Sequence, residues 1–257
     1  LAKKGSKGGF SDLKHELMNN TIIRSPQVTE ICDDFEYILR DYCDDESYAK
    51  YFNGESTLDI TNDFTVFEFS DLQQQEVLQN AVLITIVFLT YAKMQGRERR
   101  TALIIDEFWK LGNHPLLAEP IEGFARRGRK YNLSLILASQ KISDFSAEEC
   151  PAGAVALTQS DWRIMLSVEG KDYKMLREEF DMSSAEIEIA NGLSGLEGAY
   201  SEFMIRHKSG SWQIGRLLLV PFSVKLCSTK AEDVIAIKRM RAEGVPVEEA
   251  IERLLCS

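Results

Sequence analysis

The chain has 257 residues, enough to bury one hydrophobic core and to carry a small helical appendage. Its 44% hydrophobic and 27% charged residues exclude an intrinsically disordered or fibrous protein. The formal net charge of -10 argues against a dedicated nucleic-acid binder, which normally presents a basic face, although one basic segment occurs at residues 126–130. We therefore expect no specific nucleic-acid binding.

Three further features narrow the class of protein. Five cysteines are scattered without C-x-x-C spacing and three histidines stand apart from them, which predicts a reducing compartment and no zinc site. The lysines near the start are followed by glycines instead of an apolar segment, so no signal peptide is expected. The longest apolar run, residues 81–92, is too short and too interrupted to span a membrane. It predicts a buried core helix and no transmembrane segment.

The first part of the chain changes character after about fifty residues. Residues 1–50 combine a glycine-rich start with two stretches of helical apolar spacing, in which Ser11 is a predicted N-cap and Pro26 a predicted first-turn residue. Beyond them, two short β-rich stretches at residues 56–60 and 64–69 flank a turn-prone T-N-D. They predict two strands or a hairpin.

A long helix and a βαβ unit are predicted next. The helix is expected to run from Asp71 to about Met94, because the spacing of Asp71 and Gln74 approximates a capping box. The following elements are a strand at residues 101–105, a helical segment at 115–129 and a strand at 133–140. A strand, a helix and a second apolar strand within about forty residues are typical of a βαβ unit, which predicts a mostly parallel sheet.

The last third of the chain predicts a hairpin and further helices. The expected elements are a short strand at residues 162–168, helices at 171–180 and 183–193, a hairpin around residues 209–210, and closing helices that begin at Thr229, with a capping box to Glu232, and at Pro246. The fold class is therefore α/β. We expect a helical segment or lobe over residues 1–50 and a second part over residues 51–257.

Two adjacent acids end the apolar stretch T-A-L-I-I. Asp106 and Glu107 lie where a parallel strand would deliver them to the ligand-binding crevice of an open α/β sheet. In nucleotide hydrolases such a strand supplies an Asp that holds Mg²⁺, directly or through water, and a neighbouring Glu can activate the attacking water. The alternative is structural, since acids also favour the first turn of a following helix.

The second predicted strand and the segment before it carry further candidates. Gln140 ends the strand, where it would contact a γ-phosphate or a water, or merely cap the strand. The basic residues Arg126, Arg127 and Arg129 precede the strand. They would either form a solvated helix end, which cations favour, or supply an arginine finger to the phosphate of a neighbouring subunit.

Four blocks together resemble one family. In order and spacing these blocks are similar to the C-terminal part of TraC-type conjugation ATPases. The blocks are A-L-I-I-D-E-F-W-K-L-G, F-A-R-R-G-R-K-Y-N-L-S-L-I-L-A-S-Q, the closing stretch from G-R-L-L-L-V-P-F onward, and Y-F-N-G-E-S-T-L-D-I-T-N-D-F-T-V-F-E-F-S-D-L. These are motor ATPases of type IV secretion systems, in the HerA–FtsK branch of RecA-like proteins. The resemblance covers roughly residues 50–257.

The resemblance implies a fold, a reaction and partners. It implies a RecA-like mostly parallel sheet flanked by helices, with a C-terminal hairpin plus helices, and the cofactors ATP and Mg²⁺. Asp106 and Glu107 would be the Walker B pair, with Asp106 on the metal and Glu107 as the catalytic carboxylate, and Gln140 matches the strand-end glutamine of the family. An inter-subunit arginine is expected among Arg126, Arg127 and Arg129. The resemblance further implies a homo-hexamer at the cytoplasmic face of a bacterial inner membrane, with other secretion components as partners.

One departure from the family pattern bears on activity. The phosphate-binding motif G-x-x-x-x-G-K-[ST] does not occur in these 257 residues, and G-S-K-G-G-F near the start lacks both the Gly-Lys-Ser/Thr and a preceding strand. We expect the chain to be the C-terminal part of a longer ATPase and to be inactive alone. The alternatives are a non-catalytic RecA-like interaction module and a DNA-pumping coupling ATPase of the same superfamily, which would bring transmembrane helices and a basic channel.

Overall fold

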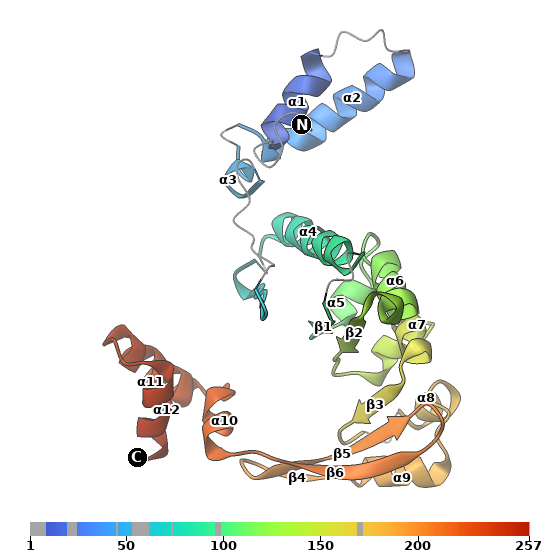
Figure 1. The fold of residues 1–257 in the computed structure, drawn as a ribbon, viewed down its shortest axis with the longest axis vertical. Helices are drawn as coiled ribbons and strands as arrows, with labels where there is room; N and C mark the ends of the chain where they lie inside the picture. The colour runs from blue at the N-terminus through green and yellow to red at the C-terminus, as the bar shows by residue number, and fades with distance from the viewer. Residues whose placement is uncertain are drawn as a thin grey trace. The chain divides into compact units, whose positions relative to one another are not determined.

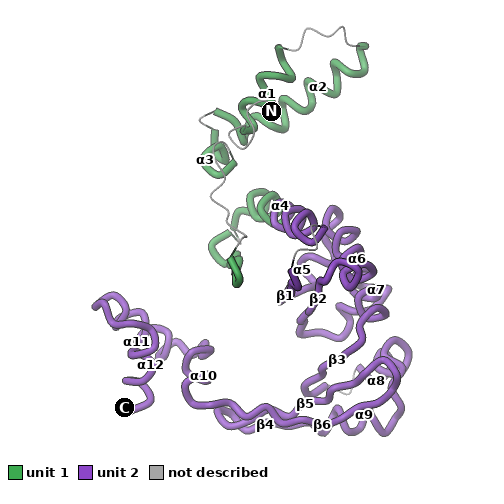
Figure 2. Tube along the Cα trace, in the orientation of Figure 1, with its two compact units in different colours: residues 1–83 green, residues 84–257 purple. Residues whose placement is uncertain are grey.

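The structure is a computed structural model that describes residues 9–19, 25–44, 46–52, 62–72, 74–95, 99–168 and 172–256 (Figure 1). The chain forms two compact units, residues 1–83 and residues 84–257, coloured separately in Figure 2. The long helix α4 (Glu76–Gln95) crosses the boundary between them. The expected division between residues 50 and 51 stays a prediction.

The regular elements in the described residues of unit 1 are all helices or 3₁₀ turns. Its elements are α1 (Phe10–Asn19), α2 (Pro26–Leu39), the 3₁₀ turn η2 (Arg40–Tyr42), α3 (Ala49–Phe52), the 3₁₀ turn η3 (Ser70–Leu72) and the start of α4. Pro26 occupies the first turn of α2, as predicted, and Ser25 caps that helix by accepting the N–H of Val28 at 3.4 Å.

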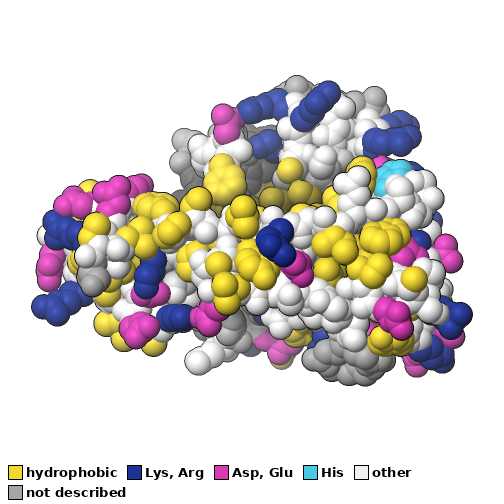
Figure 3. All heavy atoms as spheres, turned by 90° about the horizontal axis from the view of Figure 1, so that it is seen from below, with side chains coloured by type: hydrophobic (Ala, Val, Ile, Leu, Met, Phe, Trp, Pro, Cys, Tyr) yellow, Lys and Arg dark blue, Asp and Glu magenta, His cyan; other side chains and the backbone are white. Residues whose placement is uncertain are grey.

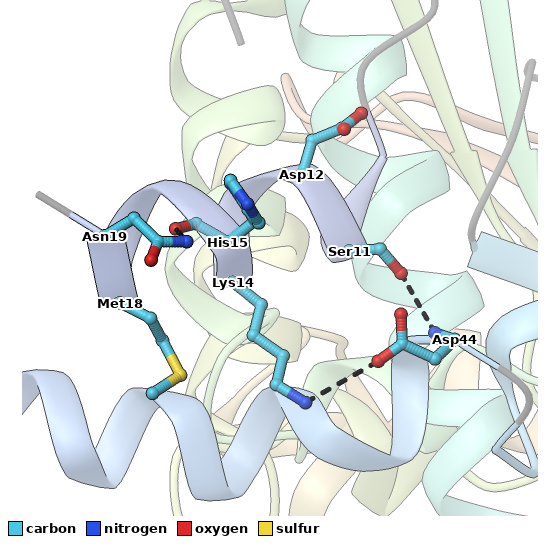
Figure 4. Close-up of a pocket in the computed structure, with 7 residues that line it drawn as sticks. All are labelled: Ser11, Asp12, Lys14, His15, Met18, Asn19 and Asp44. Carbon is cyan, nitrogen blue, oxygen red and sulfur yellow. Dashed lines mark hydrogen bonds and ion pairs between the residues drawn. The ribbon is translucent and has the colours of Figure 1, made fainter.

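The predicted N-cap at Ser11 is wrong because α1 already begins at Phe10. The Ser11 hydroxyl instead accepts the N–H of Asp44 at 2.9 Å, which ties the helix to the end of η2. Lys14 of α1 lies 3.6 Å from the Asp44 carboxylate, at the edge of a small hollow shown in Figure 4. The rings of Phe10, Tyr42 and Phe52 pack nearby, with centroids 5.3–6.0 Å apart.

The two strands predicted at residues 56–60 and 64–69 have different outcomes. The first expected strand, residues 56–60, lies outside the described residues. The second, residues 64–69, is wrong, because this stretch is irregular. Glu68 explains the difference: its Oε1 accepts the N–H groups of Phe69 and Ser70, both at 2.9 Å, and this local turn competes with a strand ladder. The same turn leads into η3, so α4 begins at Glu76 and not at the predicted Asp71.

Helix α4 is less buried than its composition predicts. The sequence predicts a core helix, yet only Leu78, Val87 and Met94 are buried in it. Its apolar residues occur nearly all round the helix, so covering one side leaves the others exposed. By length and composition alone α4 qualifies as a possible membrane span, with 17% of its most apolar window buried, and core helices meet the same criterion.

The predicted βαβ unit forms the first half of unit 2. Its elements are β1 (Thr101–Ile105), α5 (Trp109–Gly112), α6 (Ala118–Arg127), the 3₁₀ turn η4 (Gly128–Tyr131), β2 (Leu133–Leu137), the 3₁₀ turn η5 (Ile142–Phe145) and α7 (Pro151–Gln159). The two strands pair in parallel, with Ile105 opposite Leu137, which confirms the predicted βαβ unit (Figure 1). The expectation of a mostly parallel sheet is not met in the described residues, because the other four strands pair antiparallel in a separate sheet. Phe108, Ile121 and Phe124 are completely or almost completely buried beside them.

A four-stranded antiparallel sheet forms the second half of unit 2. Its strands are β3 (Trp162–Met165), β4 (Gly195–Leu196), β5 (Tyr200–His207) and β6 (Trp212–Leu218), and β5 pairs with the other three. The hairpin between β5 and β6 confirms the predicted turn, in which Gly210 adopts φ +90°. Helices α8 (Tyr173–Glu178) and α9 (Ser184–Asn191) lie within the two predicted ranges. Figure 3 shows hydrophobic side chains in a broad band across the face turned to the viewer.

A buried ion pair joins this sheet to α9. Arg206 of β5 donates through Nε to Glu186 at 2.9 Å, and its two terminal nitrogens donate to the carbonyl oxygens of Phe180 at 3.2 Å and Asp181 at 2.7 Å. Burial by itself raises the pKa of Glu186, but the hydrogen bonds from Ser183 and Arg206 outweigh it and the pKa is lowered overall. Glu186 also completes the capping box of α9 with Ser183.

The chain closes with α10 (Pro221–Leu226), α11 (Ala231–Ala242) and α12 (Val247–Leu255). The capping box predicted from Thr229 to Glu232 is wrong: Lys230 is the N-cap of α11, and no side chain caps the helix. Asp233 explains the difference, since its carboxylate accepts Lys225 Nζ and the Ser228 hydroxyl, both at 2.6 Å. These contacts draw the preceding loop toward α10 and α11 begins two residues after Thr229.

We expect Arg206→Leu to destabilise the protein by about 3–5 kcal/mol, because it leaves the buried Glu186 carboxylate without its cation. Urea unfolding measures the free energy. Arg216→Leu is the matched control, since Arg216 pairs with Glu202 on the same sheet at 2.7 Å but lies largely in solvent. We expect little change from the control. Equal losses in both variants would contradict the importance of burial.

Glu186 also predicts how stability depends on pH. Its folded pKa is lowered from the ordinary value of 4.5, so its contribution is fully present above pH 4.5 and is lost as pH falls below that value. Glu186→Gln should therefore lose less stability than wild type between pH 5 and pH 3, although it is less stable at pH 7. Urea titrations across this range measure the slopes, with Glu188→Gln on the exposed side of α9 as control. If the free energy of unfolding falls equally with pH in wild type and in Glu186→Gln, then the lowered pKa of Glu186 does not account for the pH dependence.

Candidate functional site

The carboxyl ends of β1 and β2 bring the predicted site residues together. The parallel ladder continues past both strands, because Ala138 N–H donates to the Ile105 carbonyl at 2.9 Å and Phe108 N–H donates to the Ala138 carbonyl at 3.0 Å. Glu107 of the β1 end and Gln140 of the β2 end therefore face one edge of the sheet. Their adjacency is the arrangement that the sequence predicts for a ligand crevice.

Glu107 has an unusual backbone conformation. Its φ is +49°, in the left-handed region that side-chain-bearing residues rarely adopt. The Asp106 Oδ1 atom accepts the Glu107 N–H at 2.9 Å and supports this conformation. A left-handed residue costs about 1–2 kcal/mol relative to the right-handed form, so the surrounding contacts must hold it in place. Strained residues of this kind concentrate at functional sites.

Both carboxylate oxygens of Glu107 accept hydrogen bonds. Gln140 Nε2 donates to Oε1 in a short contact, and Trp109 Nε1 donates to Oε2 at 2.6 Å. The sequence identified Gln140 as a candidate but assigned no role at the site to Trp109. The indole N–H contact with Glu107 was not predicted from the sequence. The signal available was the spacing D-E-x-W, which places a donor two residues beyond the glutamate.

The loop that carries Gln140 is held in place by contacts with η5 and α7. The Ser139 hydroxyl donates to the Asp144 carboxylate in a short contact, and Asp144 is buried in η5. Helix α7 packs directly on this turn, because a Cβ placed on Gly153 would lie 2.0 Å from the Asp144 carbonyl oxygen. Only a glycine permits that approach. The position of Gln140 thus depends on Ser139, Asp144 and Gly153.

The carboxylates at the end of β1 fit a magnesium ion that takes few protein ligands and keeps most of its waters. Among the described residues no group of three or more histidine, cysteine, aspartate or glutamate side chains could hold a metal. Mg²⁺ needs no such cluster, because it keeps several waters and takes one or two carboxylates together with substrate phosphates. Asp106 is exposed at the strand end, where it would hold the ion directly or through water. Glu107 is half-buried beside it.

The basic segment lies at the opposite end of β2. Arg126 and Arg127 end α6, and Arg129 lies in η4, immediately before the strand. Arg126 pairs with Glu122 at 3.4 Å, and the Arg127 guanidinium lies 5.8 Å from the ring centroid of Tyr91. The five residues of β2 span about 16 Å, so the structure does not bring these arginines to the Glu107 carboxylate of the same chain.

Comparisons with known proteins agree with this architecture. The family model of the TraG P-loop domain matches residues 12–255. Protein TraC of Escherichia coli (strain K12) is 25% identical over 255 residues, which is 94% of this chain and 29% of TraC. The structure of VirB4 of Thermoanaerobacter pseudethanolicus is similar with a TM-score of 0.62 and 22% identity, over 83% of this chain and 55% of VirB4.

These matches have a defined extent. The chain spans less than a third of TraC and just over half of the VirB4 chain. The likeness to VirB4 supports the predicted RecA-like α/β fold. The family model extends across almost all of the chain. The chain therefore belongs to the TraG P-loop domain family, and over most of its own length it is similar to TraC.

Proposed function

We propose that the chain supplies the Walker B half of the ATP site in a motor that energises conjugative pilus assembly and substrate transfer by a type IV secretion system. Membership of the TraG P-loop family supports ATP as the nucleotide. The observation that carries the proposal is the meeting of Glu107 with Gln140 across the ends of two parallel strands. A helix-start role for the acids would not require that contact.

Each residue of the site has a role in this proposal. Asp106 would hold Mg²⁺, directly or through water, and the ion would supply positive charge to the phosphates. Glu107 orients and deprotonates the attacking water, and Gln140 contacts the γ-phosphate or that water. The phosphates themselves need a loop of backbone N–H groups and a lysine of the G-x-x-x-x-G-K-[ST] type, which these 257 residues do not contain. The chain alone is therefore not expected to hydrolyse ATP.

The basic segment acts on a different subunit in this proposal. A guanidinium of Arg126, Arg127 or Arg129 is too far from the Glu107 of its own chain, but it can reach the phosphate of a neighbour in a ring. We therefore propose a homo-hexamer in which one of these arginines is supplied in trans. The assembly would work at the cytoplasmic face of the inner membrane with other components of the secretion system.

Glu107→Gln in the full-length protein should lower ATP turnover by about 10²–10⁴-fold, because the amide cannot accept the proton of the attacking water. Binding of a fluorescent ATP analogue with Mg²⁺ should stay within about threefold of wild type, since the side-chain shape is kept. Glu119→Gln, on the exposed side of α6, is the control. Unchanged turnover in Glu107→Gln would remove this residue from catalysis and favour a non-catalytic module.

The trans arginine can be identified by mixing subunits. Arg126→Ala, Arg127→Ala and Arg129→Ala are each tested, and the variant that lacks the finger should lose about 10³-fold in turnover. Mixing it with Glu107→Gln subunits should restore part of the activity, because some interfaces then pair an intact glutamate with an intact arginine. Lys130→Ala serves as the control. A deficient arginine variant that gains nothing on mixing would contradict a role in trans.

A further inference from the structure

We propose that Trp109 is a positioning residue for the reaction: its indole N–H holds one oxygen of Glu107 while Gln140 occupies the other and releases it when nucleotide binds. This inference rests on the proposed function, because it concerns how the Glu107 carboxylate is presented to water. Trp109 and Gln140 together form a two-donor clamp, with one donor from the segment after β1 and the other from the segment after β2. The two donors have different tasks.

The chemistry of the clamp is directional. An ionised carboxylate only accepts hydrogen bonds and an indole only donates one, so the 2.6 Å contact defines Glu107 as acceptor and Trp109 as donor. Hydrogen bonds to a charged acceptor are stronger than neutral ones. An ionised carboxylate has about four lone-pair sites, so each oxygen keeps one after these two bonds. Withdrawing one donor would leave that oxygen wholly available to a water.

Trp109 is the fixed side of the clamp. It is the first residue of α5, and the preceding residue Phe108 is fully buried and stacks on Phe145 with ring centroids 5.8 Å apart. The Phe108 N–H is also bonded to the Ala138 carbonyl. Lys110 Nζ lies 5.6 Å from the centroid of the Trp109 ring. The backbone that carries the indole is therefore held by core packing, while the Trp109 side chain itself is 42% exposed.

Gln140 is the movable side. Its side chain is exposed at the end of β2, and its amide offers a second N–H and a carbonyl oxygen besides the donor used by Glu107. A phosphate at the strand ends can therefore compete for the Gln140 amide. When the amide turns to the phosphate, Oε1 of Glu107 becomes free for water, while Trp109 still holds Oε2. The carboxylate is released without losing its orientation.

The kinetic test removes the indole donor in the full-length protein. Trp109→Phe keeps an aromatic ring and loses the N–H, and benzothienylalanine at position 109 replaces only the N–H by sulfur. We expect both to lower kcat by about 10- to 100-fold with KM for ATP within twofold, because orientation is lost and binding is not. Trp162→Phe, on β3 and 60% exposed, is the control and should match wild type.

A double variant separates positioning from folding. If Trp109 acts only through Glu107, then adding Trp109→Phe to Glu107→Gln should lower turnover by less than twofold further. The thermal midpoint of Trp109→Phe should match that of Trp162→Phe. A loss of kcat that persists in full in the Glu107→Gln background, or a fall in the thermal midpoint that accounts for the loss, would overturn the proposal.

The two proposals fail in distinguishable ways. If Glu107→Gln abolishes turnover while Trp109→Phe and the benzothienylalanine variant keep wild-type kcat, then the positioning role of Trp109 is refuted and the proposed function stands. If Glu107→Gln keeps full turnover, then both the catalytic carboxylate and its positioning residue are refuted together. A selective kcat loss in both Trp109 variants supports the clamp.

Discussion

The parallel pairing of β1 with β2 is the constraint on which the site depends. Because Ile105 lies opposite Leu137, the residues that follow both strands emerge at one edge of the sheet. Glu107 and Gln140 are 33 positions apart in the chain and meet only through this register. A shift of one residue would turn each side chain to the other face of the sheet and would separate the carboxylate from the amide.

Local strain and core packing then complete the site. The left-handed backbone at Glu107 turns the chain sharply between β1 and α5, and Asp106 supports the turn through its own carboxylate. The buried ring of Phe108 anchors the turn on one side, and the contact between α7 and η5 at Gly153 anchors the Gln140 loop on the other. The polar groups at the strand ends are therefore exposed but held by a rigid base, as catalytic groups require.

The second half of unit 2 depends on a different interaction. The buried Arg206–Glu186 ion pair joins the antiparallel sheet to α9. Arg206 also donates hydrogen bonds to the carbonyl groups of Phe180 and Asp181. The distance between the arginines of the basic segment and Glu107 of the same chain bears on how the site would be completed. If one of these arginines is the proposed finger, it would act between subunits, and the proposed hexamer would then couple catalysis to assembly.

The sequence by itself determined those features that depend only on residues close together in the chain. The apolar run ending in Asp106 and Glu107, the βαβ unit, Pro26 at a helix start and the hairpin at Gly210 follow from periodicity and turn chemistry. Local competition defeated other predictions, as Glu68 did for the strand at residues 64–69 and Asp233 for the cap at Thr229. Only the tertiary structure decided that Trp109 and Gln140 both contact the Glu107 carboxylate. Such contacts depend on strand register and backbone conformation, which residue type alone does not specify.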